Sequence, residues 1–533
     1  MYRPRDRAQA LHDSLIVRRT EKGKTMNQSG MTQARYFVTP GFETTPVGQI
    51  VKVINPATLE VVGQRLVTDN ATIQAVIARA NIAQSSWAKI DSKTRASVLH
   101  RIADRIERAG PRDVAVLMTR EMGKPYPESV GEIANCAAIF RYYAEMARDD
   151  GGKIAGTTQA GSFQYSRYHP LGVSVHIMPF NFPVLLMCWT VAASLAAGNA
   201  CIVKPAEATS MCTLEFMQHF NHLPAGLLSC LPGDVQVAQT LIQSKATHAV
   251  AFTGSVAAGC EVGATCARLM KPCVIENGGN DPMIISRHAP IDVAVAGSVT
   301  AAFHLSGQVC TSSERFFVVD AVHDEFVDKF AVMTRKLRVG NGMGKSEIGP
   351  LVSKAARDKV ERLVNETIAA GATLVCGGQR PVGLDTGWFY EPTILTGITP
   401  DMSIMHEECF GPVASICRVV NFEEALERAN DSEFGLGAAV FTADLAEAMD
   451  AAEQLQSGLV WINNPLIDND ALPFGGWKMS GLGRELGRQG LDAFRRQKMV
   501  ILDHHPQIHD WWYPYPDDWF YEDGGRKLDD QSG

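Results

Sequence analysis

The stretch Gly307-Gln308-Val309-Cys310-Thr311-Ser312-Ser313-Glu314-Arg315 joins two segments of different character. The alanine-rich residues 293–303 before it predict a helix, and the apolar run 316–319 after it predicts a strand. A cysteine on a glycine-started turn at such a junction can face a cleft, and its thiolate is a nucleophile where the surroundings lower its pKa. Most of the twelve cysteines are expected to be inert packing residues. Cys310 becomes the candidate nucleophile because other stretches complete a site.

Two upstream stretches supply partners for this cysteine. Residues 274–282, Val-Ile-Glu-Asn-Gly-Gly-Asn-Asp-Pro, place Glu276 at the end of an apolar strand before paired glycines, where a chain approaches a ligand. Residues 178–183, Met-Pro-Phe-Asn-Phe-Pro, put Asn181 in an apolar setting that can fix an amide donor for a developing oxyanion. Nucleophile, base and oxyanion donor are the parts that acyl chemistry requires.

Together these stretches resemble the aldehyde dehydrogenase superfamily, and residues 387–393 and 473–481 extend the resemblance over roughly residues 48–500. The resemblance implies an α/β fold: a doubly wound Rossmann-like cofactor domain, an α/β catalytic domain and a small β oligomerisation element. It also implies NAD-dependent oxidation of an aldehyde to its carboxylic acid. Cys310 would form a thiohemiacetal and then a thioester, with the oxyanion held by Asn181 and the Cys310 N–H, and Glu276 would activate the hydrolytic water.

One residue departs from the family pattern, because Asn277 stands where a leucine usually follows the catalytic glutamate. A polar amide there is expected to alter how Glu276 moves or is solvated, but it removes no required group. Lys124 and Lys478 lie in recurrent family motifs, and we assign them structural roles. No metal site is predicted, because the cysteines are scattered without a CxxC pair.

The cofactor candidates are Lys204, Glu207, Gly254, Ser255, Gly259, Glu408 and Phe410. Residues 254–259 follow a strand and open a helix, where free N–H groups meet a phosphate, although tight packing alone would also explain these glycines. The resemblance implies that Ser255 meets the pyrophosphate and that Glu408 binds the nicotinamide ribose beside Phe410.

By the same resemblance, Lys204 and Glu207 hold the adenosine ribose, although alone they would read as a solvated surface pair. An acid at position 207 would repel a 2′-phosphate, which favours NAD. NADP stays open because Lys204 could pair with a phosphate.

The substrate candidates are Phe182, Leu186, Trp189, Asp468 and Phe474. The first three recur at i, i+4 and i+7 on one helical face, which is typical of helix packing and of a pocket wall alike. The resemblance places them, with Phe474, along the substrate tunnel. Asp468 or Asp470 could attract a cationic aldehyde such as betaine aldehyde or an aminoaldehyde, unless they are merely solvated. No arginine lies on the helical face, which argues against dicarboxylate semialdehydes.

Two other functions stay open. One is a coenzyme A-acylating dehydrogenase, which would need no base at Glu276; the other is a non-catalytic protein with the same fold. The presence of Glu276, Cys310 and Asn181 together favours the hydrolytic enzyme.

Chain length, hydrophobic content and net charge indicate the number of domains and the classes of protein to which this chain can belong. A chain of 533 residues with 46% hydrophobic residues predicts several packed domains. A net charge of −8 gives no reason to expect nucleic acid, and no apolar run predicts a membrane span. The scattered distribution of the twelve cysteines fits a reducing compartment, so a cytoplasmic location is expected. The expected units are an N-terminal extension (1–40), a discontinuous NAD-binding domain (41–148 and 171–277), a catalytic domain (278–484), an oligomerisation element (149–170 and 485–510) and a tail (511–533).

The tail is densely aromatic: Trp511, Trp512, Tyr513, Tyr515, Trp519, Phe520 and Tyr521 fall within eleven residues. Prolines 506, 514 and 516 are expected to keep it extended rather than helical. The preceding residues 498–502 predict a strand, which in the resembled family crosses to a partner subunit. We therefore expect the tail to pack on a neighbouring protomer of a homodimer or homotetramer; the alternative is a tail folded on its own subunit.

Overall fold

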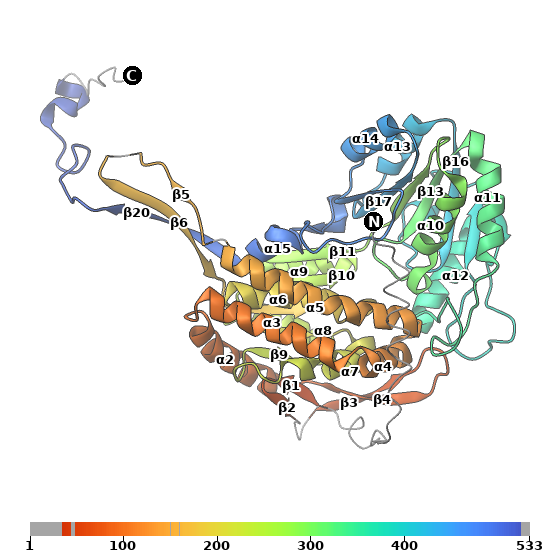
Figure 1. Cartoon of the computed structure of the whole chain (residues 1–533), viewed down its shortest axis with the longest axis horizontal. Coiled ribbons are helices and arrows are strands. Elements are labelled where there is room, and N and C mark those ends of the chain that lie inside the picture. The colour runs from red at the N-terminus through yellow and green to blue at the C-terminus, as the bar shows by residue number, and fades with distance from the viewer. Residues whose placement is uncertain (1–34, 44–47, 150, 159, 524–533) are drawn as a thin grey trace.

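The computed structural model describes residues 35–43, 48–149, 151–158 and 160–523. These residues form two large α/β units, a projecting β ribbon and a tail (Figure 1). Most of the predicted N-terminal extension and the last ten residues of the predicted tail lie outside the described residues. No helix in the described part is both long and apolar enough to cross a membrane.

The first unit is built on an eight-stranded sheet of order β19-β11-β10-β7-β8-β9-β1-β2. Its parallel centre is β11 (Cys273–Asn277), β10 (Ala249–Gly254), β7 (Val173–Ile177), β8 (Ala200–Lys204) and β9 (Leu228–Cys230). Antiparallel strands close both edges: β19 (Gly481–Leu482), β1 (Tyr36–Val38) and β2 (Gly41–Glu43). A two-stranded ribbon, β3 (Gln49–Ile54) and β4 (Val61–Val67), lies beside it.

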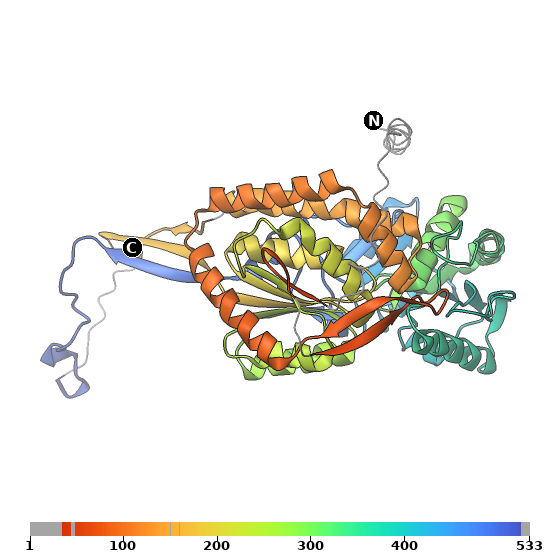
Figure 2. The ribbon, with the colours of Figure 1, turned by 90° about the horizontal axis from the view of Figure 1, so that it is seen from below.

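Helices cover both faces of this sheet (Figure 2). They are α2 (Asn70–Trp87), α3 (Ser92–Ala109), α4 (Arg112–Met122), α5 (Tyr126–Asp149), α6 (Leu185–Ala197), α7 (Ser210–Phe216), α8 (Val235–Gln243), α9 (Val256–Arg268) and α15 (Gly487–Asp492), with the 3₁₀ turns η1 (Glu207–Thr209) and η2 (Met217–Phe220). Asp91 caps α3 by accepting the Thr94 N–H at 2.9 Å. Helix α6 is buried on nearly every face because it lies inside the unit.

The second unit carries a seven-stranded sheet of order β14-β15-β16-β13-β12-β17-β18. Its strands are β12 (Asp281–Ile285), β13 (Ser313–Val319), β14 (Thr373–Cys376), β15 (Thr393–Thr396), β16 (Val413–Val419), β17 (Gly437–Phe441) and β18 (Leu459–Ile462). Its helices are α10 (Ile291–Phe303), α11 (Asp320–Thr334), α12 (Lys354–Ala369), α13 (Phe422–Asn430) and α14 (Leu445–Gln454), with η3 (His304–Gly307), η4 (Ser403–Met405) and η5 (Lys478–Ser480). All strands except β14 run parallel to their neighbours, so the doubly wound α/β prediction is confirmed.

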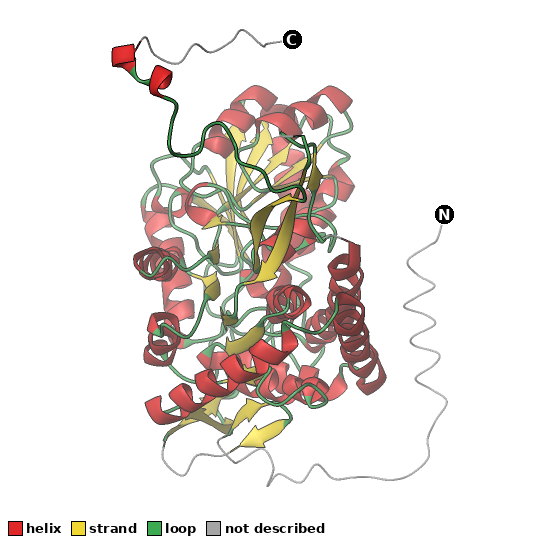
Figure 3. Cartoon of the chain, turned by 90° about the vertical axis from the view of Figure 1, so that its left-hand side faces the viewer, coloured by secondary structure: helices red, strands yellow, loops and turns green. Residues whose placement is uncertain are grey.

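A three-stranded ribbon projects from the first unit and ends in the tail. It consists of β5 (Ile154–Ala155), β6 (Ser162–Pro170) and β20 (Arg495–Asp503), with β20 on the outside. Figure 3 shows the tail, with its short helices η6 (Asp517–Trp519) and η7 (Tyr521–Asp523), standing clear of the body.

Three details correct the sequence expectations. Strand β1 lies inside the range assigned to the extension, where Phe37 is fully buried. Strand β19 pairs with β11 of the first sheet, although it lies in the range expected for the second unit. The tail is not wholly extended, because two 3₁₀ turns form after the prolines.

Candidate active site

Cys310 lies in the wall between two cavities. The first, which we call the aromatic cavity, has a volume of about 490 Å³ and includes Phe182, Trp189 and Phe474 in its lining. The second, the glycine cavity, has a volume of about 390 Å³ and includes Gly254 and Gly278. Cys310 is the residue that the two linings share. A thiol in this position can meet one ligand from each side.

The turn before Cys310 is tightly constrained. Leu305, Ser306 and Gly307 all have positive φ angles, of 51°, 56° and 72°. A side chain at Gly307 would place its Cβ 2.0 Å from the Gly411 carbonyl oxygen, so glycine is required there. The Ser306 hydroxyl donates to the Gly349 carbonyl at 2.9 Å. This packing presents Cys310 between helix α10 and strand β13.

Asn181 is brought beside the cysteine turn. Its side chain is buried, and its Nδ2 donates to the Gln308 carbonyl at 3.0 Å while its Oδ1 accepts the Phe182 N–H at 3.0 Å. Asn181 also lines the glycine cavity together with Cys310. The amide is thus oriented by the backbone on both sides.

Glu276 lies near the end of β11 but lines neither cavity. Burial raises the pKa of its carboxyl well above the usual range, and Glu485 and Asp281 add to the rise. Its Oε1 has no hydrogen-bond partner among the described residues. The carboxyl is therefore held as a buried acid behind the cavity wall, close enough to Cys310 to raise the pKa of its thiol.

Asn277 takes a place in the glycine cavity instead. Its Nδ2 donates to the Met479 carbonyl at 2.9 Å, and its Oδ1 packs on the Cα of Gly259, where a Cβ would approach it to 2.0 Å. This contact explains the need for glycine at position 259, in the second turn of α9. Gly259 itself does not line the cavity.

The pKa of the Cys310 thiol is raised well above its usual value. Burial is the main cause, and the charges of Glu276, Asp281, Asp468 and Glu408 act in the same direction. A positively charged ligand in either cavity would oppose this effect and favour the thiolate.

The glycine cavity gathers four of the cofactor candidates, Gly254, Ser255, Glu408 and Phe410. Ser255 caps α9, so the N-terminus of this helix faces the cavity. Glu408 accepts the Gly279 N–H at 3.1 Å and packs on Gly278, where a Cβ would lie 2.0 Å from its Oε1. Burial raises the pKa of Glu408 to about 7. The paired glycines after Asn277 thus let this carboxyl approach.

Sequence reasoning missed the group that holds the Glu408 turn. The buried carboxylate of Glu314 accepts the Cys409 N–H at 2.7 Å and the Phe410 N–H at 2.8 Å, and Phe410 has φ +53°. Glu314 stands in the quoted cysteine stretch, but its partners lie 95 and 96 residues away. No local pattern reveals that pairing.

Lys204 and Glu207 line neither cavity. Lys204 is buried at the end of β8, and burial lowers the pKa of its ammonium. Glu207 forms an ion pair with Arg65 of β4, which comes from 142 residues away and which the sequence did not suggest. The Arg65 side chain is buried, while that of Glu207 is 46% exposed.

All five substrate candidates line the aromatic cavity: Phe182, Leu186, Trp189, Asp468 and Phe474. The Trp189 and Phe474 rings meet edge to face at 4.9 Å between centroids. Asp468 retains exposure to solvent, while partial desolvation by the surrounding protein raises the pKa of its carboxyl to about 6. Asp470 does not line the cavity.

Two further acids, Glu128 and Glu132, line the aromatic cavity and were missed. Glu132 pairs with Lys124 at 2.5 Å and accepts the Val184 N–H at 2.9 Å, so its charge is compensated where α6 begins. Lys124 also lies 4.1 Å from the centre of the Phe182 ring. Glu128 contacts His304 Nδ1 at 3.2 Å, while its Oε2 has no partner among the described residues.

The glycine cavity fits a nicotinamide dinucleotide. It combines a capped helix N-terminus for phosphate, the Glu408 carboxylate for ribose hydroxyls, and the apolar rings of Phe180 and Phe410, which meet edge to face at 5.8 Å. The Lys359 side chain adds a cation to the lining.

Comparison with known proteins agrees with this geometry. The model of the aldehyde dehydrogenase family matches residues 43–500. The chain belongs to the aldehyde dehydrogenase family. A betaine aldehyde dehydrogenase from Brucella anthropi is 36% identical over 477 residues, which is 88% of this chain and 97% of that protein. The tail lies beyond the family match.

Solved structures of other aldehyde dehydrogenases share the fold. That of an aldehyde dehydrogenase from Brucella melitensis biovar abortus has a TM-score of 0.87 at 33% identity, covering 91% of this chain and 100% of the other. A betaine aldehyde dehydrogenase from Staphylococcus aureus in complex with NAD+ has a TM-score of 0.87 at 30% identity, covering 92% and 99%. An NADP-dependent enzyme from Escherichia coli has a TM-score of 0.86 at 32% identity, covering 90% and 99%. This aldehyde dehydrogenase is accordingly an NAD(P)-dependent oxidoreductase, as predicted.

Proposed function

We propose that this aldehyde dehydrogenase is a hydrolytic, NAD-preferring enzyme for aldehydes that carry a positive charge. The observation that carries the proposal is the lining of the aromatic cavity, which combines three aromatic rings with Asp468 and Glu128. Among the described residues, no lysine or arginine lines it. Aromatic faces and carboxylates both favour cations, and neither favours an anionic aldehyde.

In the proposed reaction Cys310 is the nucleophile, Asn181 stabilises the oxyanion and Glu276 is the base. The Cys310 thiolate forms a bond to the aldehyde carbon, and the Asn181 Nδ2 donates to the resulting oxyanion. A nicotinamide dinucleotide held by the lining of the glycine cavity would supply the acceptor for the hydride that this carbon loses. The product on Cys310 is a thioester. Glu276 must turn toward Cys310 from behind the cavity wall to take a proton from the water that attacks the thioester, and the carboxylic acid leaves as the cysteine is restored.

Glu276 distinguishes this reaction from acyl transfer to coenzyme A. A buried glutamate with a raised pKa is suited to hold the water proton, whereas acyl transfer to a thiol needs no such group. NADH formation without coenzyme A supports the hydrolytic reaction, and strict dependence on coenzyme A would exclude it. All twelve cysteines are free, which favours a reducing compartment such as the cytoplasm.

Charge recognition can be tested with two substrates of the same shape. Betaine aldehyde and 3,3-dimethylbutanal differ by a quaternary nitrogen in place of a carbon. We expect kcat/KM to favour the cation, and Asp468→Asn to reduce that preference about tenfold because a negative charge in the cavity lining is lost. Asp470→Asn is the matched control, since it removes an acid from the same loop outside the lining. Equal kcat/KM values for the two aldehydes would contradict the proposal without affecting the assignment to the family.

A further inference from the structure

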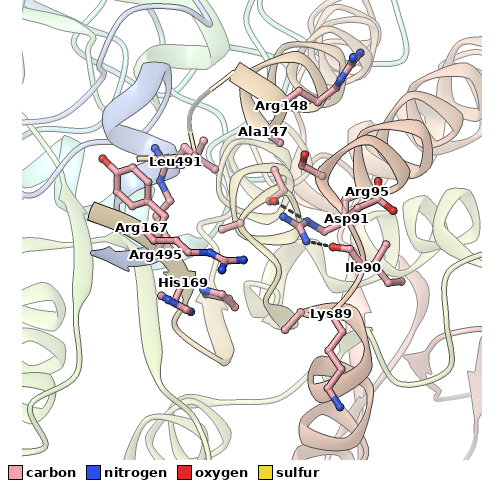
Figure 4. Close-up of a pocket in the computed structure, with 17 residues that line it drawn as sticks. Lys89, Ile90, Asp91, Arg95, Ala147, Arg148, Arg167, His169, Leu491 and Arg495 are labelled. Carbon is pink, nitrogen blue, oxygen red and sulfur yellow. Dashed lines mark hydrogen bonds between the residues drawn. The ribbon is translucent and has the colours of Figure 1, made fainter. Parts of the chain in front are cut away.

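A third cavity of about 460 Å³ lies where the β6–β20 ribbon leaves the body. Its walls come from the α2–α3 connection, the end of α5, the root of the ribbon, the end of α6 and α15 (Figure 4). We call it the root pocket. It shares no lining residue with the aromatic or glycine cavity.

The root pocket is strongly basic. Its lining contains five lysine or arginine residues and a single acid, Asp91; the five are Lys89, Arg95, Arg148, Arg167 and Arg495. The pKa of His169, also in the lining, is lowered by burial and by the nearby charges of Lys498, Arg167 and Arg496. Positive charge from the ribbon therefore reaches into the pocket.

Two guanidinium groups enter the root pocket from opposite sides, as Figure 4 shows for Arg95 and Arg495. Arg95 donates to the Ala196 carbonyl at 3.1 Å and to the Ile90 carbonyl. Arg495 stacks on the Tyr168 ring at 3.5 Å and pairs with Asp492. Among the described residues, Lys89, Arg148 and Arg167 have no ion pair. The apolar part of the lining is Ala88, Ile90, Ala147, Pro170, Ala196, Ala197 and Leu491.

The tail has the complementary composition. Residues 504–523 contain five acidic residues and no lysine or arginine. Their aromatic side chains are unusually exposed for large rings, at 59% for Trp511, 83% for Tyr513 and 95% for Tyr521. The rings also pack on one another, with Tyr515 and Trp519 stacked at 5.7 Å. The tail is thus an acidic and aromatic segment with several of its large rings exposed.

The position of the tail points to another chain. It leaves the ribbon at the end opposite the root pocket and turns away from its own body (Figure 1). The outer strand β20 beside it also exposes Met499, Ile501 and Leu502, at 76%, 56% and 47%. Exposed apolar side chains on an edge strand, followed by an exposed aromatic segment, are typical of a region that contacts a protein partner.

We propose that the tail of one chain docks in the root pocket of a second copy of this chain. Aromatic rings of the tail cover the apolar lining, and the carboxylates of Asp517 and Asp518 meet the guanidinium groups. The pocket volume exceeds that of a single indole ring, so it admits a ring together with a carboxylate. The docking segment lies outside the family match, whereas the root pocket that receives it lies within it.

Charge reversal on each side tests the docking. We expect Asp517→Lys with Asp518→Lys, and separately Arg148→Glu with Arg167→Glu, to weaken self-association of the full chain about tenfold in analytical ultracentrifugation. All four residues are exposed or half-exposed, so the fold should tolerate the changes. Combining the two pairs should restore most of the association. Lys336→Glu with Lys345→Glu is the matched control, because both are exposed on the second unit.

Truncation after His505 provides the second measurement. It should weaken association at least as much as charge reversal in the tail, with NADH formation retained as evidence of folding. Unchanged association would overturn the proposal. A lower melting temperature with unchanged association would mean that the tail folds on its own subunit. Two results would overturn the assignment to the root pocket. One is unchanged self-association when Arg148 and Arg167 are both replaced by glutamate, and the other is a combined variant whose self-association is not restored.

Discussion

At the scale of single residues, Glu276 and Glu485 determine how the enzyme should respond to pH. Both carboxyls are buried, and neither oxygen of Glu485 has a partner among the described residues. Burial raises the pKa of Glu485 to about 8, and Glu485 in turn raises that of Glu276. Two such groups release their protons as a coupled pair.

The first residue-scale prediction concerns the acidic limb of the pH profile. A base acts only when ionised, so hydrolysis should increase with pH up to the raised pKa of Glu276. Glu485→Gln removes the neighbouring carboxyl, so this limb should shift to lower pH by about one unit or less. The measurement is kcat against pH. Glu453→Gln, on the exposed face of α14, is the control, and an unmoved limb in Glu485→Gln would mean that the two groups do not interact.

The raised pKa of Glu485 also makes the free energy of unfolding depend on pH. The folded chain retains a proton on Glu485 that the unfolded chain releases near its ordinary pKa of 4.5. This group therefore contributes stability below that value, and the contribution is lost as pH rises toward 8.

The second residue-scale prediction concerns cofactor choice. Glu207 neutralises the buried Arg65, and removing its charge would leave that cation available to a 2′-phosphate. We expect Glu207→Gln to raise the ratio of kcat/KM for NADP to that for NAD about tenfold. Adding Arg65→Gln should cancel most of the gain. A ratio that does not change in Glu207→Gln would place this pair away from the adenosine ribose.

At the scale of elements, the sequence predicts best what depends on local chemistry. The residues on either side of the cysteine stretch predicted the end of α10 and the strand β13, and the spacing of Phe182, Leu186 and Trp189 indicated one face of α6. The glycine-started turn between α10 and β13 also indicated that Cys310 faces a cleft. These features need only neighbours along the chain.

Pairings between distant elements were not predictable in this way. Arg65 with Glu207, and Glu314 with the Glu408 turn, join segments that only the folded chain brings together. Glu276 was expected to face the reacting groups, but it lines neither cavity and pairs with Gly481 of the distant strand β19. Periodicity carries no information on such contacts.

The element-scale prediction tests the turn that Glu314 holds. Glu314→Gln keeps the shape but replaces one acceptor oxygen with an NH₂ group that faces a backbone N–H. We expect the KM for NAD to rise severalfold with a smaller change in kcat, because Glu408 would lose its fixed position. Glu407→Gln, on the exposed side of the same turn, is the control. Equal effects of the two variants would contradict the role given to Glu314.

At the scale of the whole molecule, Cys310 is accessible from two independent directions. The glycine cavity is built from the strand ends of the first sheet together with α12 and the Glu408 turn, whereas the aromatic cavity is built from α5, α6, η3 and residues 465–468. Occupation of one cavity therefore leaves the other open. It also changes the electrostatics at the shared thiol, because the groups that raise its pKa are all acidic.

Alkylation of Cys310 by iodoacetamide, followed by peptide mass spectrometry, tests this arrangement. The free enzyme should react slowly at neutral pH, because its thiol pKa is raised. Saturating NAD+ should accelerate the reaction severalfold, since its positive nicotinamide ring favours the thiolate while the aromatic cavity still admits the reagent. Choline, a cation without an aldehyde group, should protect Cys310 by filling the aromatic cavity. The exposed Cys260 serves as the internal reference in each sample. Full protection by NAD+ alone would show that both ligands use a single entrance, and the separation of the two cavities would then have no role in catalysis.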